Sequence, residues 1–336
     1  MTNTADSTAN GDTNIGDTAA EAKSKQAGSN GQKTTDNSAD ALGQTGSEAQ
    51  SSEPYVPVPI TIKSLMAAGA HFGHQTPRWN PKMTKYIFGE RNGIHILNLD
   101  ITLDHWQQAS KFIKDVVGRG GEVLIVGTKP QAQRVVREAA QRCGAYYIVS
   151  RWLGGTLSNF QTIKNSIARM RKLEELLVKA EDPNSEINLA KKERLKIRKD
   201  LVKLEANLGG IKNMKKIPDV IFVVDIIKES IAVSEARKLH VPIVGLVDTN
   251  TDPTPIDFPI PSNDDAARTI MLFTNAIADV ITEGRREYAA KKSKDARESK
   301  AAAKAKSSKT SKKKEVKAEK EGETSAEATS VEAAAS

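Results

Sequence analysis

The chain is poor in cysteine, in aromatic residues and in long apolar runs, and each shortage excludes a class of protein. Its 336 residues include one cysteine, Cys143, so no internal disulfide is possible and no cysteine cluster has structural-zinc spacing. The longest apolar stretch, at 220–224, ends at Asp225 and is far shorter than the ~20 residues that a bilayer span needs. The first 54 residues lack both the basic start and apolar run of a secretory signal and the arginines of a transit peptide. We therefore expect a cytoplasmic protein that does not interact with membranes.

Aromatic residues are absent from both ends of the chain. Residues 1–54 contain 8 acids and 3 lysines, and residues 289–336 contain 13 Lys and Arg against 8 acids. Apart from alanine, these segments have almost no apolar side chains to offset the ~1–2 kcal/mol of backbone entropy that each ordered residue costs. We predict a disordered acidic extension at 1–54 and a disordered Lys/Ala/Glu-rich tail at 289–336. All 15 aromatic residues lie in the basic segment 55–288.

The middle of the chain alternates between strand and helix patterns. The predicted strands are 123–126, 146–149, 220–224 and 242–247, and the predicted helices are 102–117, 130–143, 228–239 and 264–287. Upstream we predict a short helix from Thr61 to Gly69 or Gly73, a loop at 71–81, and strand-like pieces at 85–88 and 94–97. Apolar strands that alternate with helices are typical of a mainly parallel sheet with helices on both faces. This α/β sheet domain comprises 55–157 and 210–288.

Residues 158–209 interrupt this alternation because they carry no strand signal. Apolar residues recur at helical spacing in two segments, 160–177 and 197–211, and the steps of four and three in the second match a coiled-coil seam. Asp182-Pro183-Asn184 predicts a turn between them. We therefore predict an inserted antiparallel coiled-coil hairpin with arms ~30 Å long at ~1.5 Å per residue.

Three features suggest an enzyme or a metalloprotein, but each has a simpler explanation. The glycine turns at 127–129 and 154–155 follow strands, where α/β folds bind nucleotides, yet neither matches a phosphate-binding fingerprint. Residues 71–74 include two histidines, but only Glu90 lies nearby as a third metal ligand. The carboxylates of 248–253 suit Mg²⁺ or Asx turns equally well. We predict no catalytic residue, cofactor, metal or small-molecule substrate; the alternative is a Rossmann-type nucleotide-binding enzyme with a helical dimerisation hairpin.

Basic side chains occur where phosphates are the natural counter-charge. Cations interleaved with aromatic rings at 78–91 suit looped or single-stranded RNA, with Trp79 either anchoring this segment or plugging the sheet domain. The hairpin, with its flanking residues 158–212, has 13 Lys and Arg against 8 acids, which indicates either phosphate contacts or a water-exposed face. The candidate RNA or assembly contacts are Arg78, Trp79, Lys82, Lys85, Arg91, Lys164, Arg169, Arg171, Lys191, Lys192, Arg194 and Lys196.

Eight strings, taken together, resemble the bacterial small-ribosomal-subunit protein S2 family along roughly residues 60–287. They are 64–76, 78–83, 87–89, 126–129, 151–159, 208–214, 218–225 and 247–253. The resemblance implies a Rossmann-like or flavodoxin-like domain with a coiled-coil hairpin and no catalysis. It also implies contacts with small-subunit ribosomal RNA and neighbouring ribosomal proteins, including the S1 protein that captures messenger RNA. Both long ends lie outside the family pattern.

Overall fold

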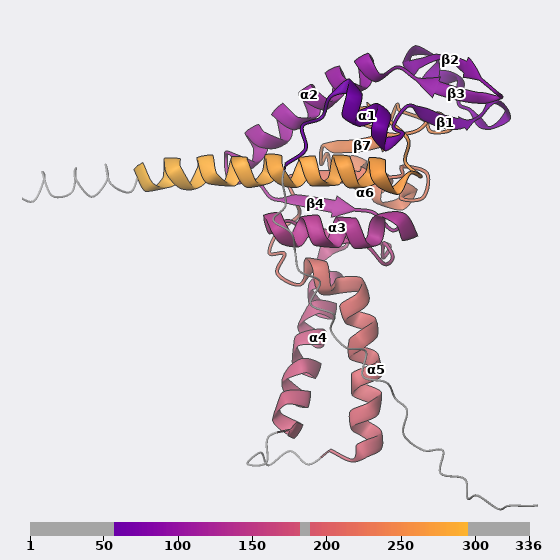
Figure 1. The fold of residues 1–336 in the computed structure, drawn as a ribbon. Helices are drawn as coiled ribbons and strands as arrows, with labels where there is room; N and C mark the ends of the chain where they lie inside the picture. The colour runs from indigo at the N-terminus through magenta and orange to yellow at the C-terminus, as the bar shows by residue number, and fades with distance from the viewer. Residues whose placement is uncertain (1–56, 182–188, 295–336) are drawn as a thin grey trace, which may run out of the picture. The chain divides into compact units, whose positions relative to one another are not determined.

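The computed structural model describes residues 57–181 and 189–294. The predicted extension at 1–54, the predicted turn at 182–184 and the tail from residue 295 onward lie outside these residues. The described chain forms an α/β fold with a five-stranded parallel sheet, a three-stranded antiparallel sheet and two long helices that contact each other (Figure 1).

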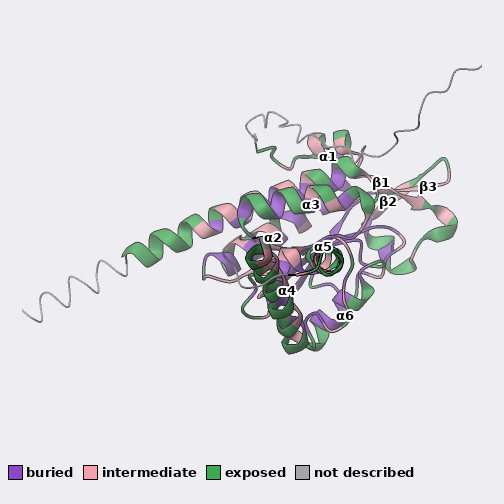
Figure 2. Cartoon of the chain, turned by 90° about the horizontal axis from the view of Figure 1, so that it is seen from below, coloured by how far each residue is buried: buried purple, intermediate pink, exposed green. Residues whose placement is uncertain are grey.

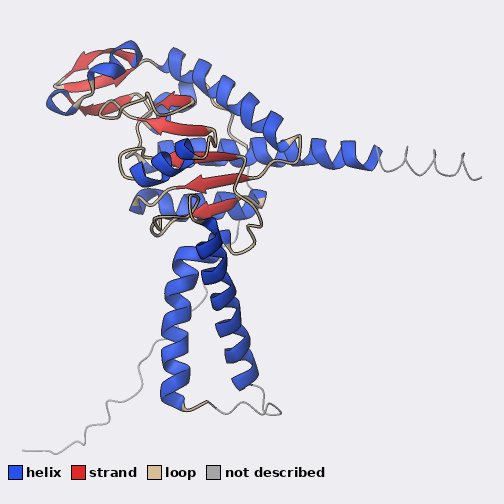
Figure 3. Cartoon of the chain, turned by 180° about the vertical axis from the view of Figure 1, so that it is seen from behind, coloured by secondary structure: helices blue, strands red, loops and turns tan. Residues whose placement is uncertain are grey.

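The parallel sheet has the strand order β5-β4-β6-β7-β8. Its strands are among the red arrows of Figure 3, with helices around them. Its strands are β4 (Val123–Val126), β5 (Tyr146–Ile148), β6 (Val220–Val224), β7 (Ile243–Val247) and β8 (Phe258–Pro261). The first four confirm predicted strands to within one residue at each end. β8 was not predicted from the sequence; its Pro259 and Pro261 are tolerated because β8 is an edge strand and hydrogen-bonds only to β7.

Successive residues of each strand contribute to two separate hydrophobic clusters. Val123 and Ile125 belong to one cluster, whereas Leu124 and Val126 belong to the other. The first cluster includes side chains of α2 (Leu99–Val117), α3 (Pro130–Cys143) and the helix at 267–294, and the second includes those of α6 (Ser230–Lys238) and the start of α4 (Phe160–Glu181). Both faces of the sheet are therefore buried, which is why its strands are almost continuously apolar.

Helix boundaries follow local capping signals. α1 (Ile62–Ala68) begins after Thr61, whose side chain accepts a hydrogen bond from a backbone N–H, and ends at Gly69 in the left-handed conformation. α2 begins three residues before its predicted start because Asn98 caps it. The last helix spans 267–294 and continues past the predicted end at Glu287. No helix in the described ranges is long and apolar enough to cross a bilayer.

The small antiparallel sheet was not predicted. β1 (Phe72–Gln75) and β2 (Ile87–Arg91) pair on either side of β3 (Ile94–Leu97). The predicted loop at 71–81 therefore contains a strand, and the predicted strand at 85–88 is shifted because residues through Tyr86 form a 3₁₀ helix. The overlooked signal is Asn92-Gly93, whose positive φ angles of 54° and 73° form the two-residue turn between β2 and β3.

α4 and α5 (Lys191–Leu208) form the predicted helix pair between β5 and β6 in the sequence (Figure 1). Ile163, Ile167 and Met170 of α4 are buried near the sheet, as is Leu208 of α5. Beyond this base the predicted seam positions are half-buried, and the remaining surface of both helices is mostly exposed (Figure 2). The apolar positions predicted in the two segments are therefore the less exposed positions of each helix.

Candidate nucleic-acid interface

The carboxyl ends of the parallel strands meet where open α/β sheets commonly bind ligands. Here ion pairs of the chain itself lie beside a hollow of about 390 Å³. Lys129, which follows β4, has its Nζ 2.9 Å from Asp225, 2.7 Å from Asp264 and 2.7 Å from Asp265. Burial disfavours its charge, but the neighbouring carboxylates, Asp264 foremost, raise the pKa of the Lys129 ammonium above its usual value. A cation of the chain itself therefore neutralises these carboxylates.

His74 reaches the same carboxylates from the small sheet. Its Nδ1 lies 3.2 Å from Asp248 Oδ1, and its Nε2 lies 3.4 Å from Asp265 Oδ2. The hydrogen bond to Asp248 raises the pKa of His74, and burial acts against this rise. Gly73 permits the approach, because a Cβ at this position would clash with the Thr249 side chain. The small sheet thus covers the edge of the crevice.

The loop after β7 contains the Asx turn that the sequence left as an alternative to Mg²⁺. Asp252 Oδ1 accepts a hydrogen bond from the Thr254 N–H at 2.9 Å, and its Oδ2 lies 2.6 Å from Lys82 Nζ. The hydrogen bond from Lys82 is the main reason that the pKa of Asp252 is lowered to about 2. Asp252 therefore stabilises the turn within its own loop and also links this loop to Lys82 in the small-sheet region.

The two glycine turns singled out as nucleotide sites both hold a carboxylate of the chain. At the first turn, the Thr128 N–H donates to Glu229 Oε1 at 3.0 Å, and the Thr128 hydroxyl donates to the same oxygen. Glu229 is 2% exposed, and this burial raises the pKa of its carboxyl group. The backbone N–H that would face a phosphate at this turn is already occupied.

Glu235 of α6 occupies the second turn in the same manner. Its carboxylate accepts hydrogen bonds from the N–H groups of Gly155 at 2.7 Å, Leu157 at 2.9 Å and Ser158 at 3.1 Å. It also accepts a 3.2 Å hydrogen bond from Trp152 Nε1. Burial opposes ionisation, but the backbone donors outweigh it and lower the pKa of Glu235. This carboxylate fixes the loop from which α4 begins.

Metal and nucleophile candidates do not form a reactive group in the described chain. The His71 ring packs against Phe72 with ring centroids 4.0 Å apart and planes tilted by 39°, whereas His74 points to the aspartates. Across residues 57–181 and 189–294, no three His, Cys, Asp or Glu residues form a group that could hold a metal ion. Cys143 is buried, which raises the pKa of its thiol and keeps it protonated.

The predicted contacts of the small-sheet region precede the hairpin in the sequence, and their side chains differ from one another in environment. Arg78, Lys85 and Arg91 are exposed, and Lys85 Nζ lies 4.6 Å from the centroid of the Tyr86 ring. Lys82 is also exposed, but its ammonium is engaged by Asp252. Three of the four predicted cations thus present their charge to solvent without the ion pair that Lys82 makes.

Trp79 does not plug the sheet domain. Its side chain is 38% exposed and packs against His95 of β3, with ring centroids 5.1 Å apart. The buried side chains of this segment are Met83 and Tyr86, which join the hydrophobic cluster of α6. They, and not Trp79, anchor the segment to the core.

The predicted hairpin cations fall into two groups. Lys164, Arg169 and Arg171 lie on the part of α4 that leaves the sheet, whereas the other group begins α5 at the far end of the hairpin (Figure 1). The far group consists of Lys191, Lys192, Arg194 and Lys196. Arg194 is half-buried and the rest are exposed.

A cleft of about 540 Å³ at the hairpin base gathers cations that sequence reasoning did not connect. Lys164 and Arg171 line one side, and Lys212 and Lys215 line the other. Neither Lys212 nor Lys215 was a predicted contact. The available signal was the segment 212–216, which has three lysines and no acid.

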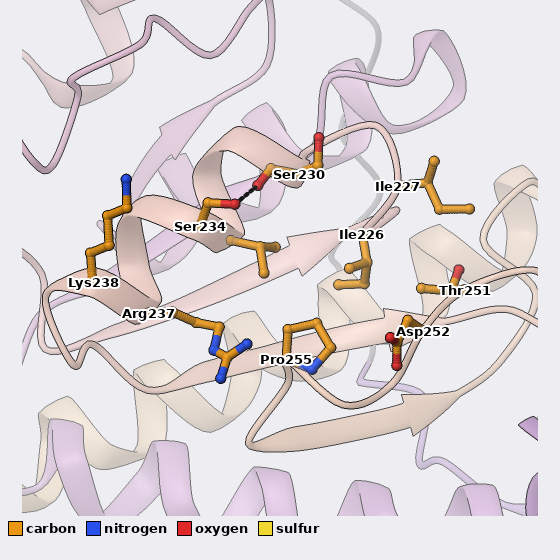
Figure 4. A pocket seen from close by; sticks show the side chains of 10 residues that line it. Ile226, Ile227, Ser230, Ser234, Arg237, Lys238, Thr251, Asp252 and Pro255 are labelled. Carbon is orange, nitrogen blue, oxygen red and sulfur yellow. Dashed lines mark hydrogen bonds between the residues drawn. The ribbon is translucent and has the colours of Figure 1, made fainter. Parts of the chain in front are cut away.

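A second hollow, of about 560 Å³, lies beside α6 (Figure 4). Ile226, Ile227 and Pro255 form apolar walls, and Arg237 and Lys238 stand at one side. Ser234 donates to the Ser230 carbonyl within α6. Asp252 is the sole acid of its lining and is paired with Lys82, so the described hollow has no acid-base pair for catalysis.

These features define a class of protein: an α/β protein whose strand-end carboxylates are paired with a lysine of the chain and whose exposed cations lie on a projecting helix pair and beside the small sheet. The family model for ribosomal protein S2 matches residues 65–284. The chain belongs to this family, and it is a structural, non-enzymatic constituent of the small ribosomal subunit.

Curated relatives agree with this assignment. The chain is 54% identical over 225 residues to the small ribosomal subunit protein uS2 of Koribacter versatilis, covering 67% of this chain and 73% of the relative. It is 53% identical over 236 residues to uS2 of Desulfatibacillum aliphaticivorans, covering 70% and 79%. The uS2 of Acidobacterium capsulatum is 53% identical over 225 residues, covering 67% and 73%.

Proposed function

We propose that this chain binds small-subunit ribosomal RNA mainly through phosphate contacts from its helix pair. The observation that carries the proposal is the placement of charge. Lys129 in the crevice is paired with carboxylates, whereas most cations of α4 and α5 are displayed on exposed helix surfaces. Lysine and arginine on such surfaces reach phosphates more easily than base edges in A-form RNA.

The fold class and the helix pair belong to the same proposal. The strand order, in which β4 lies between the edge strand β5 and β6, supports a flavodoxin-like arrangement. The inward-facing apolar positions of α4 and α5 support a coiled-coil hairpin. A stiff hairpin would place cations far from the sheet, where a separate RNA segment lies within reach.

Protein neighbours form the second part of the proposal. The small antiparallel sheet exposes Phe72 and Phe88, the latter 79% exposed, next to Arg78 and Lys85. Mixed apolar and basic surface suits contacts with neighbouring small-subunit proteins, S1 among them. Assembly into the small subunit places the protein in the cytoplasm.

The RNA proposal is tested at the far end of the hairpin. Replacement of Lys191, Lys192, Arg194 and Lys196 by Gln should lower affinity for transcribed small-subunit RNA and reduce the slope of log K against log salt. Each lost phosphate contact changes that slope by ~0.7 to 0.9. The readout is filter binding between about 50 and 300 mM salt, a range over which salt increasingly screens exposed charges.

A matched variant controls for net charge. Lys63, Lys111, Arg119 and Lys238 are exposed cations outside the helix pair, and their replacement by Gln removes the same charge. This control should keep the wild-type salt slope. Equal slopes for wild type and the hairpin variant would show that the far cations face water, and absence of wild-type binding would reject the proposed function.

A further inference from the structure

We infer that the cleft at the hairpin base is a preformed binding site for the RNA phosphate backbone. The inference rests on the proposed RNA-binding function and assigns it a site. The cleft lies between the first turns of α4 and the segment at 212–215 that follows the hairpin. Lys164, Arg171, Lys212 and Lys215 surround an apolar floor that includes Ile167 and Met214.

Contacts within the chain hold these cations in place before any ligand arrives. Arg171 donates through Nη2 to the Lys212 carbonyl at 2.8 Å and to Asn213 Oδ1 at 3.4 Å. Because a guanidinium has five N–H donors, the others remain available to an anion. Lys164 Nζ lies 4.8 Å from the centroid of the Phe160 ring. Holding these side chains in place reduces the ordering cost of binding.

The charge of the cleft is only partly compensated. Lys212 Nζ lies 2.6 Å from Glu174, and this carboxylate also fixes the lysine against α4. Lys164 and Lys215 make no ion pair within the described ranges, and Lys215 is exposed. Four cations with one neighbouring carboxylate thus leave a net positive cleft. An anion that bridges the two walls would relieve this repulsion.

The lining favours a phosphodiester backbone over a base or a nucleotide. No aromatic ring is among the residues that line the cleft, so a base has no aromatic platform on which to stack there. Cations on opposite walls match successive phosphates of one strand, and lysine binds phosphate as a point charge without reading sequence. The cleft should therefore contribute affinity and salt dependence without sequence specificity.

The test compares two triple variants of the full chain. Lys164→Gln, Arg171→Gln and Lys215→Gln remove cleft charge and leave the Lys212–Glu174 pair intact. Lys63→Gln, Lys111→Gln and Lys238→Gln remove the same charge from exposed positions elsewhere. The probe is transcribed small-subunit RNA, measured by filter binding across a salt series.

The cleft variant should bind at least tenfold more weakly at about 150 mM salt, with the salt slope reduced by ~2 to 3. The control variant should change affinity by less than threefold. The double variant Lys164→Gln, Lys215→Gln, which keeps the backbone contacts of Arg171, should retain the wild-type melting temperature and lose slope by ~1.5 to 2.

Four outcomes would overturn the inference. Equal losses of RNA affinity in the cleft and control variants would indicate that the protein's overall charge, and not the cleft, attracts the RNA. Unchanged RNA binding, combined with poorer incorporation into small subunits, would assign the cleft to a protein neighbour. Saturable binding of inorganic pyrophosphate at micromolar concentration and constant ionic strength, lost in the cleft variant, would indicate a small-anion site. Wild-type protein that fails to bind the RNA would reject the proposed function itself, whereas wild-type binding with an unaffected cleft variant rejects the inference alone.

Discussion

Two buried glutamates occupy the glycine turns at which α/β sheets commonly bind nucleotides. Glu229 and Glu235 lie at the start of α6 and within it, and each accepts backbone N–H groups from a glycine turn. Such N–H groups are the usual partners of a bound phosphate. The carboxylates take the position of that phosphate, so the turns are satisfied without a ligand.

Glu235 should be required for the fold of the loop that begins α4. Glu235→Ala leaves three buried or half-buried N–H groups and the Trp152 indole without acceptor, which should cost about 3 kcal/mol or more. For a domain of this size that corresponds to a fall in melting temperature of roughly 6 to 12 °C. Trp152 fluorescence should shift to longer wavelength in the folded variant. A loss below about 0.5 kcal/mol, the scale of surface substitutions, would contradict this role.

The cluster around His74 should make stability depend on pH. A raised histidine pKa gives stability that is present below about pH 6.5 and is lost as pH rises through the folded-state value. Burial, with Asp248 and Asp225 nearby, raises the pKa of Asp264 from 3.8 to about 7, so the folded protein holds extra protons in this window also. Both effects have the same sign: this cluster stabilises the fold less as pH rises from 5 to 8.

The measurement is the melting temperature of wild type and of His74→Asn between pH 5 and 8. The difference between them should be largest at pH 5 and should shrink toward pH 8. His240→Asn is the matched control, because His240 is exposed with a φ of 54°, a conformation that asparagine tolerates. A constant difference across this range would exclude His74 as the source.

At the scale of elements, the connection between the helix pair and the sheet is tightly packed. Gly210, which follows α5, lies so close to β5 that a Cβ would clash with the Tyr147 carbonyl oxygen. Ser150, two residues after the end of β5, donates through Oγ to the Ala206 carbonyl at 2.7 Å. These contacts join α5 to the edge strand and fix the end of the α4–α5 helix pair that lies next to the sheet.

Gly210→Ala should therefore be destabilising by about 2 kcal/mol or more, since backbone atoms must move. Gly154→Ala provides the control: no atom lies within 4 Å of its added Cβ, and its φ is not positive. That substitution should be neutral, or stabilising by up to ~1 kcal/mol through the unfolded chain. Denaturant unfolding of both variants measures the contrast, and similar stabilities for the two would refute close packing at Gly210.

At the scale of the whole molecule, the ion pairs of the crevice predict the absence of nucleotide binding. Lys129 spans Asp225, Asp264 and Asp265 across the strand ends, so an entering phosphate would meet carboxylates and a cation that is already paired. Titration calorimetry with ATP or NAD at micromolar protein should show no saturable heat. Saturable binding that Lys129→Gln abolishes would restore the enzyme interpretation.

Local sequence determined most of the elements of this protein. Strands β4 to β7, the helices between them and the inward-facing positions of α4 and α5 follow from apolar spacing and capping residues that act over a few neighbours. The basic character of the helix pair also follows from the sequence, because counting charged residues requires no structure.

Only the tertiary structure decided which distant residues meet. Lys129 and Asp264 are 135 positions apart, and Glu235 contacts a turn about 80 positions away. The basic cleft joins α4 to a segment that follows α5, so no local pattern contains it. The small sheet and the proline-bearing edge strand β8 were missed for the same reason: strand pairing depends on a partner, and periodicity describes a segment alone.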